Sequence, residues 1–221
     1  MMISPEGFYD AYLKGKTTDE ILTVIRSLKR EINYLKTTIE HPEYQCMIHP
    51  SESTRISCNR LYLEQAKQAL WDSDVEYKPS KAEKKALEFN DNVSEIERIV
   101  FAQYNAWGLK KSTSIIFQDE DVVLRKYNPF APSLEEKVID RVCNVDRDEL
   151  FDEIRRLYIG EWRAHYDLKR FDYYVLDGDK WEIIVRFKNG KRTVKKIGVN
   201  AYPYNFEAFT ELFKMDEEVD R

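Results

Sequence analysis

The sequence is poor in the residues that build disulfide frameworks, collagen-like repeats and flexible linkers. Its 221 residues include three cysteines, seven glycines and seven prolines. A small, odd number of cysteines cannot form a disulfide framework, and reduced thiols in the cytoplasm explain them most simply. The scarcity of glycine and proline excludes a collagen-like or linker-like chain. The 43% share of hydrophobic residues is enough to build a buried core in a chain of this length.

Long hydrophobic runs are also missing. No stretch approaches the roughly 18 consecutive apolar residues that a membrane-spanning helix needs. The first six residues have neither the cationic nor the apolar region of a secretory signal. We therefore expect a cytoplasmic protein without a membrane partner.

The motifs of common enzyme classes are absent as well. The sequence contains no Gly-rich phosphate loop and no G-x-S-x-G motif, and only three histidines could act as a base. The 35 basic and 40 acidic side chains give a net charge of −5, which excludes a module that binds nucleic acid through its overall charge. These absences favour a protein without catalytic activity and give no reason to expect a cofactor.

Helical signals dominate residues 1–90. Thr17 and Glu20 form a capping box, and apolar residues then recur at alternating spacings of four and three. A second seam with such spacings follows residues 41–50, a connector that lets the two helices fold back on each other. We therefore expect an antiparallel helical hairpin. The first seam consists of Ile21, Ile25, Leu28, Ile32, Leu35 and Ile39, and the second of Ile56, Asn59, Leu63, Ala66 and Leu70.

Strand signals appear in residues 91–221. Short β-branched and aromatic runs predict a three-stranded meander, and capping patterns predict further helices. The sequence as a whole predicts an α+β fold, in which the helical hairpin region (1–90) precedes a small antiparallel sheet packed with helices (91–221). The predicted strands span 96–104, 113–117 and 122–127, and the predicted helices span 133–142, 146–158 and the residues from 206 onward.

The strongest turn signal is Asn189-Gly190, which lies between two alternating runs. This pair predicts a type I′ β-hairpin in which Val185 faces Val194 and Ile184 faces Lys195. One face of the hairpin is then basic and could contact phosphates or an acidic partner, although lysines on an edge strand also serve to prevent unwanted pairing. The candidate binding residues are Arg186, Lys188, Lys191 and Lys195 on this face, and Arg26, Lys29 and Arg30 on the exposed flank of the first long helix.

Two weaker constellations could carry metal chemistry. His41, Cys46, His49 and Cys58 supply four nitrogen or sulfur ligands of the kind that zinc prefers, although only Cys46 and His49 have a ligand-like spacing. A helix–helix connector with a buried cysteine explains the same residues.

The second constellation contains Glu161, His165 and Asp167. Glu161 and His165 are four residues apart, which on a helix would place them on one face, where carboxylates and a histidine could hold a divalent metal for phosphodiester chemistry. Ordinary surface carboxylates are the alternative interpretation.

Two segments near the C-terminus resemble a pattern found in uncharacterised proteins of Gram-positive gut bacteria and their phages and mobile elements. They are Asp177-Gly178-Asp179-Lys180-Trp181 and the residues from Gly198 to Phe206, GVNAYPYNF. The resemblance implies a setting among accessory genes of phages and integrated elements. Small proteins of such genes often resemble anti-defence factors, including inhibitors of CRISPR nucleases, which act by binding.

The leading hypothesis is therefore a non-enzymatic binding protein, an anti-CRISPR-like inhibitor that docks on a host nuclease or nucleoprotein complex. A metal-dependent enzyme acting on nucleic acid or nucleotides, through Glu161 and His165, is one alternative. The other alternative is an accessory protein that binds nucleic acid directly through the basic hairpin face.

Overall fold

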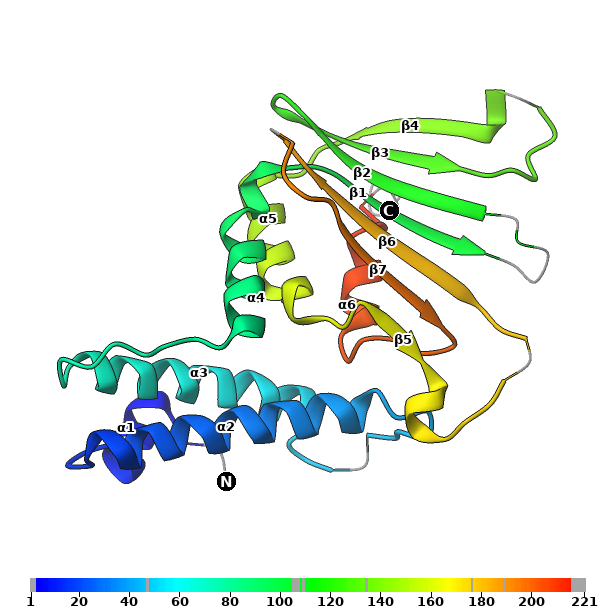
Figure 1. The fold of residues 1–221 in the computed structure, drawn as a ribbon. Coiled ribbons are helices and arrows are strands. Elements are labelled where there is room, and N and C mark those ends of the chain that lie inside the picture. The colour runs from blue at the N-terminus through cyan, green and yellow to red at the C-terminus, as the bar shows by residue number, and fades with distance from the viewer. Residues whose placement is uncertain are drawn as a thin grey trace. The chain divides into compact units, whose positions relative to one another are not determined.

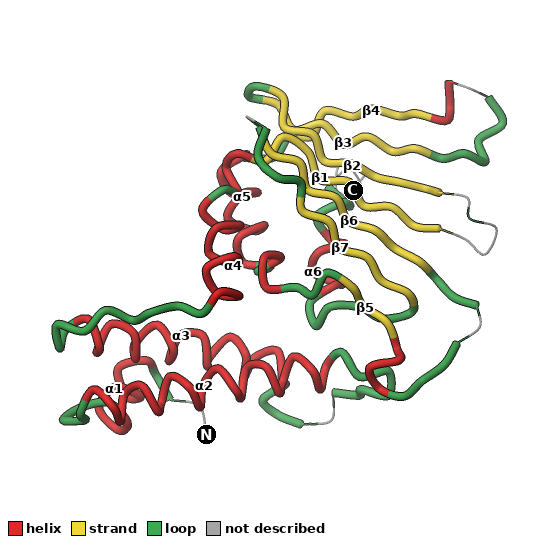
Figure 2. Tube along the Cα trace, in the orientation of Figure 1, coloured by secondary structure: helices red, strands yellow, loops and turns green. Residues whose placement is uncertain are grey.

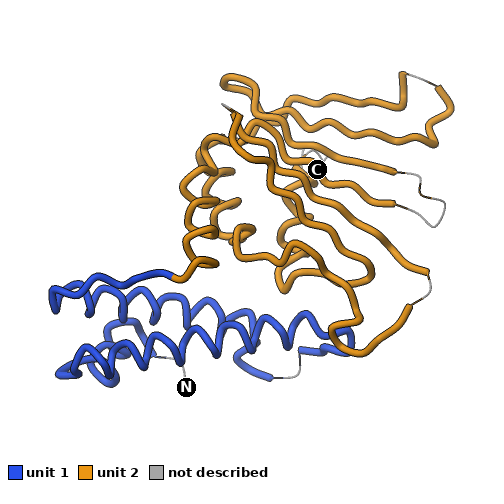
Figure 3. The backbone as a smooth tube through the Cα atoms, viewed as in Figure 1, with its two compact units in different colours: residues 1–79 blue, residues 80–221 orange. Residues whose placement is uncertain are grey.

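The computed structural model describes residues 3–46, 48–104, 108, 110–133, 135–175, 177–188 and 190–215. Contacts divide the chain into two units, residues 1–79 and 80–221 (Figure 3). The division lies before residue 90, so helix α4 (Lys81–Asp91) is grouped with the second unit. The expected mixture of helices and a mainly antiparallel sheet is confirmed.

The first unit contains helices α1 (Pro5–Tyr12), α2 (Thr18–Ile39) and α3 (Glu52–Trp71), of which α2 and α3 lie side by side (Figures 1 and 2). Thr17 and Glu20 form the predicted capping box, and five of the six predicted seam positions of α2 are buried. In α3 three of the five predicted seam positions are buried: Ile56, Ala66 and Leu70. Asn59 and Leu63 are half-buried, and Tyr62, next to Leu63, is buried instead. The Tyr62 ring stacks on Phe8 with a centroid distance of 4.3 Å, which attaches α1 to α3.

The second unit is built around a seven-stranded sheet with the strand order β4-β3-β2-β1-β6-β7-β5 (Figure 1). All neighbouring strands are antiparallel except β5 and β7, and β1, β2 and β3 form the predicted meander. The strands are β1 (Ile96–Tyr104), β2 (Lys110–Gln118), β3 (Asp121–Tyr127), β4 (Val138–Cys143), β5 (His165–Asp167), β6 (Lys180–Phe187) and β7 (Val194–Val199).

Helices of the second unit pack on one face of this sheet, which we call the inner face. Besides α4 they are α5 (Arg147–Arg156) and α6 (Phe206–Glu211). Because side chains alternate along a strand, every second residue of the central strands points into this core. Three inner-face phenylalanines each meet one helix: Phe101 contacts Phe209 of α6, Phe117 contacts Phe151 of α5, and Phe187 contacts Phe89 of α4.

The helix predicted over residues 133–142 is wrong. Ser133 does accept a hydrogen bond from the backbone of Glu136, but only a single 3-10 turn follows before strand β4 begins. β-Branched residues favour the strand. Asp140 then fixes β4 to β3, because both of its carboxylate oxygens accept hydrogen bonds from Arg125 at 2.7 Å. The 3-10 turns are η1 (Val93–Glu95), η2 (Glu135–Lys137), η3 (Ile159–Glu161) and η4 (Leu168–Phe171).

The register of the C-terminal hairpin is confirmed. Val185 pairs with Val194 and Ile184 pairs with Lys195, as expected. Strand β7 begins at Val194 rather than directly after the predicted Asn189-Gly190 turn. Gly190 has a positive φ of 69°, whereas Asn189, the first residue of the predicted turn, lies outside the described residues.

In the described parts of the chain, no helix is both long and apolar enough to cross a bilayer.

Candidate functional site

The three residues considered for catalysis do not share a helix face. Helix α5 ends at Arg156, Glu161 ends the 3-10 turn η3, and His165 begins strand β5. The predicted helical relation between Glu161 and His165 is therefore wrong, because Tyr158 adopts a left-handed φ of 51° and interrupts the helix. His165 and Asp167 are both exposed and point to the same side of β5.

The four residues considered for zinc lie around the connector between α2 and α3 and at the start of α3. The Nδ1 atom of His41 accepts a hydrogen bond from the backbone of Glu43 at 3.2 Å. Cys46 and His49 are exposed, and Cys58 is half-buried on α3. Over the described ranges, no group of three or more His, Cys, Asp or Glu side chains is placed to hold a metal ion, here or near Glu161.

The segments that carry the sequence resemblance make internal contacts. The indole Nε1 of Trp181 donates to the carbonyl of Ala201 at 2.9 Å, and any side chain at Gly198 would overlap the Trp181 ring. Asn200 has a positive φ of 50°, and its side-chain oxygen accepts from the backbone N–H of Asp179 at 2.8 Å. These motif residues therefore fix the end of the β6–β7 pair, and the resemblance is carried by residues that determine the fold.

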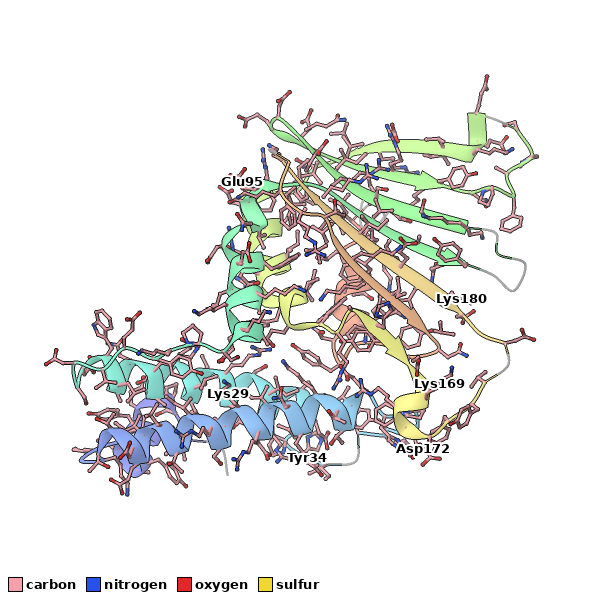
Figure 4. The ribbon with its side chains drawn as sticks, in the orientation of Figure 1. Lys29, Tyr34, Glu95, Lys169, Asp172 and Lys180 are labelled. Atoms are coloured by element: carbon pink, nitrogen blue, oxygen red, sulfur yellow. The ribbon has the colours of Figure 1, made fainter. Side chains whose placement is uncertain are left out.

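The candidate cations on α2 differ in their surroundings. Lys29 is labelled on α2 in Figure 4. It donates from Nζ to the Tyr77 hydroxyl at 3.0 Å, so that its ammonium group is held within the first unit. Arg26 and Arg30 are exposed and lie one helical turn apart.

The four candidate cations of the hairpin do not gather at one place. Arg186 and Lys195 lie on the face of the sheet opposite to the helices, because Lys195 pairs with Ile184 and side chains alternate along β6. Lys191 instead reaches the side-chain oxygen of Asn92, next to the end of α4. Lys188 lies beyond the end of β6, where its backbone N–H donates to the carbonyl of Glu95 at 2.8 Å.

The outward-pointing side chains of the sheet form a surface that we call the open face. It includes Arg98 and Tyr104 of β1, Ser114 of β2, Arg125 and Tyr127 of β3, Asp140 and Val142 of β4, Glu182 and Arg186 of β6, and Lys195 of β7, as the pairing registers show. The contacts of α4, α5 and α6 with phenylalanines are all on the inner face. Figure 1 shows the same arrangement, with these helices on one side of the sheet.

Three arginines lie on the open face: Arg98, Arg125 and Arg186. Arg98 stands directly opposite Arg186 on the neighbouring strand, and its Nη2 donates to the hydroxyl of Ser114 at 2.9 Å. Ser114 is only 1% exposed, although it lies on a face without helices. Burial, together with the positive charges of Arg125 and Arg186, lowers the pKa of Arg98. The arginines are therefore close enough to influence one another.

Two of the cations on the open face are neutralised by carboxylates. Arg125 pairs with Asp140 through two hydrogen bonds, and Lys195 pairs with Glu182 at 2.8 Å. Tyr104 also donates to Glu182, at 2.5 Å. Although burial acts in the opposite direction, the hydrogen bonds from Lys195 and Tyr104 lower the pKa of Glu182. Burial and this carboxylate raise the pKa of Tyr104 to about 12.

Arg98 and Arg186 have no such partner. In the part of the chain that the structure describes, neither forms an ion pair with a carboxylate, and the buried Nε of Arg98 has no hydrogen-bond partner. The sequence prediction included Arg186 but missed Arg98 and Arg125. The alternation of β1 contained the signal for Arg98, because Ile99 and Phe101 point inward and their neighbours must then point outward.

We compared the chain with protein families, curated proteins and solved structures. No family model, curated protein or solved structure matches the chain.

Proposed function

We propose that this chain is a binding protein that docks on a nuclease or nucleoprotein complex, with the open face of the sheet as its contact surface. The observation that carries the proposal is the pair of arginines, Arg98 and Arg186, that occupy directly opposite positions on β1 and β6 without a carboxylate partner in the described residues. Like charges directly opposite one another destabilise a sheet. An anionic partner would offset that cost.

The apolar side chains at the end of the open face support the same function. Val142 is 69% exposed and Val138 is 47% exposed, both on the edge strand β4. Tyr127 on the adjacent strand is 39% exposed. Protein interfaces combine aromatic and apolar groups with arginine, and a few such residues supply most of the binding energy. The open face offers both kinds of group on one surface.

The sequence resemblance supports a particular kind of partner. Segments of this type are similar to those of proteins from phages and mobile elements, where anti-defence inhibitors act by binding. A CRISPR nuclease loaded with its guide RNA is a nucleoprotein, and the phosphates of its nucleic acid are anionic. The proposed activity is therefore inhibition of such a complex.

A direct test mixes the purified full-length chain with purified guide-loaded CRISPR nucleases from Gram-positive bacteria. We expect the wild-type chain to bind at least one complex and to slow its cleavage of target DNA. Arg186→Glu should weaken binding about tenfold or more, as expected for a central interface arginine. Lys84→Glu makes the same charge change at an exposed position of α4, and should bind like wild type. Failure of the chain to bind any complex would overturn the proposed function, and equal effects of the two variants would overturn the role of the open face.

A further inference from the structure

Arg98 and Arg186, neither of which pairs with a carboxylate in the described residues, have the chemistry of an oxyanion site. A guanidinium group presents a planar fork of N–H donors that matches the oxygens of a phosphate, and two forks can hold one anion from two sides. Arg98 and Arg186 are directly opposite each other on neighbouring strands, which lie about 4.8 Å apart. The Nη2 of Arg98 is held by Ser114, which fixes its position, while Arg186 is exposed and can approach a ligand.

The shape of the surface restricts which nucleic acid can supply the phosphate. The major groove of duplex DNA admits a helix or a two-stranded ribbon, whereas Arg98 and Arg186 lie on adjacent strands inside a seven-stranded sheet. A single strand can instead lie flat across a sheet, with its backbone on the cations and its bases on aromatic side chains. Tyr127 is 39% exposed on the same face and can provide such a stacking surface.

We propose that Arg98 and Arg186 form a phosphate-binding subsite for single-stranded nucleic acid on the open face, with Tyr127 as a base-stacking residue. This inference rests on the proposed function in one respect, because it takes the open face as the contact surface. It adds the ligand: the exposed single strand of the nucleoprotein, rather than an acidic protein surface.

The charges of the chain limit this binding to short-range contacts between a few side chains and the phosphates. The net charge of the protein is −5, so that long-range attraction of a polyanion is not expected. Arg125 and Lys195 are already paired with carboxylates, whereas Arg98 and Arg186 are not, and these two arginines are therefore placed to carry the phosphate contact. Each phosphate contact on a single strand contributes about 0.7 to the slope of log affinity against log salt concentration.

The test measures the fluorescence anisotropy of a labelled single-stranded oligothymidylate with the full-length chain over a series of salt concentrations. We expect Arg186→Met and Arg98→Met each to weaken binding about tenfold and to lower the salt slope by about 0.7. Arg98→Lys keeps the charge but not the fork, and should also bind less tightly than wild type. Tyr127→Ala should weaken binding about fivefold with an unchanged salt slope. Lys84→Met is the matched control and should bind like wild type.

Circular dichroism melting of each variant separates lost binding from lost structure. Arg186 is exposed, so Arg186→Met is expected to fold normally and keeps the test decisive if Arg98→Met does not fold. Equal affinity of wild type, Arg186→Met and Lys84→Met would overturn the inference. Polyglutamate that competes as well as unlabelled oligonucleotide would also overturn it, because the face would then recognise negative charge in general. If the chain inhibits a nuclease complex but does not bind the oligonucleotide, the inference fails while the proposed function stands.

Discussion

The two faces of the seven-stranded sheet come from alternate residues of the same strands, yet they have opposite characters. On the inner face, phenylalanines of three strands pack edge-on or stacked against phenylalanines of three helices. On the open face, arginines stand opposite each other and apolar side chains of β4 are exposed. The inner face is arranged for stability. The open face includes a like-charge pair that weakens the sheet, which is the pattern expected of a surface used for binding.

The largest expected effect is the loss of an aromatic ring from the inner face. Phe209 is fully buried and contacts Phe101. Phe209→Ala should lower the free energy of unfolding by about 3–5 kcal/mol, because it removes buried apolar surface and leaves a cavity. Val142→Ala on the open face is the contrasting variant, and should change it by less than about 0.5 kcal/mol. Urea denaturation of both variants checks the contrast, and equal losses would show that the two faces do not differ as described.

The next largest expected loss of stability comes from replacing Gly198, a glycine of the inner face. Gly198→Ala would place a methyl group where the Trp181 ring lies, and that ring is fixed by its hydrogen bond to Ala201. We expect a loss of about 2–3 kcal/mol from overpacking, seen as a lower thermal midpoint. Gly7 offers a control, because an added Cβ there would meet Ser4 Oγ at an ordinary 3.5 Å. Gly7→Ala should therefore leave stability unchanged or slightly raised, and a larger loss at Gly7 would contradict the packing argument.

Two adjacent lysines of β7 lie on opposite faces of the sheet, so that a lysine on the open face can be compared with a buried one. Lys195 is exposed on the open face, whereas Lys196 is 5% exposed on the inner face, where its ammonium donates to the carbonyl of Trp162. Burial, with a smaller contribution from Lys85, lowers the pKa of Lys196 to about 8. The unfolded chain therefore holds this proton more tightly than the folded chain.

The stability of the wild type should consequently rise as the pH increases from about 8 towards 10, the window between the folded pKa and the ordinary value of 10.5. Lys196→Met should stabilise the protein by on the order of 2 kcal/mol at pH 7 and remove this rise. Lys195→Met should leave the rise unchanged. Chemical denaturation at several pH values checks both variants, and a persisting rise in Lys196→Met would exclude Lys196 as its source.

The smallest expected effect concerns the ion pair on the open face. Asp140→Asn removes the charge that neutralises Arg125. Stability should fall by less than about 1 kcal/mol, because the pair is partly exposed. Affinity for the oligonucleotide should rise about threefold, because a third guanidinium group becomes available. Unchanged or weaker binding in the anisotropy assay would indicate that Arg125 lies outside the contact surface.

Much of the fold was accessible from the sequence because local signals agreed with the final structure. The seam of α2, strand β1 and the register of the C-terminal hairpin follow from periodicity and turn chemistry. Residues 138–143 differ from the sequence prediction, because the capping pattern at Ser133 leads only to a 3-10 turn and the β-branched residues that follow form a strand. The pairing of Asp140 with Arg125, which fixes β4 in the sheet, is a contact between strands that periodicity does not reveal.

The candidate site was only partly accessible. The sequence indicated Arg186 and Lys195, because both belong to one hairpin with a strong turn signal. Arg98 and Arg125 come from strands that are distant in sequence, and their proximity to Arg186 depends on the strand order of the sheet. Which face carries the helices is likewise a tertiary property. A surface formed from β3, β1 and β6 therefore required the structure.

Methyl NMR of the wild-type chain with and without the oligonucleotide tests the central claim most directly. Ile183 and Ile184 are neighbours on β6 that point to opposite faces, since Ile183 is fully buried in the core and Ile184 is opposite Lys195. We predict that the methyl signals of Ile184 shift on binding while those of Ile183 stay in place. Shifts confined to Ile183 or to the residues of the first unit would contradict the assignment of the open face as the binding surface.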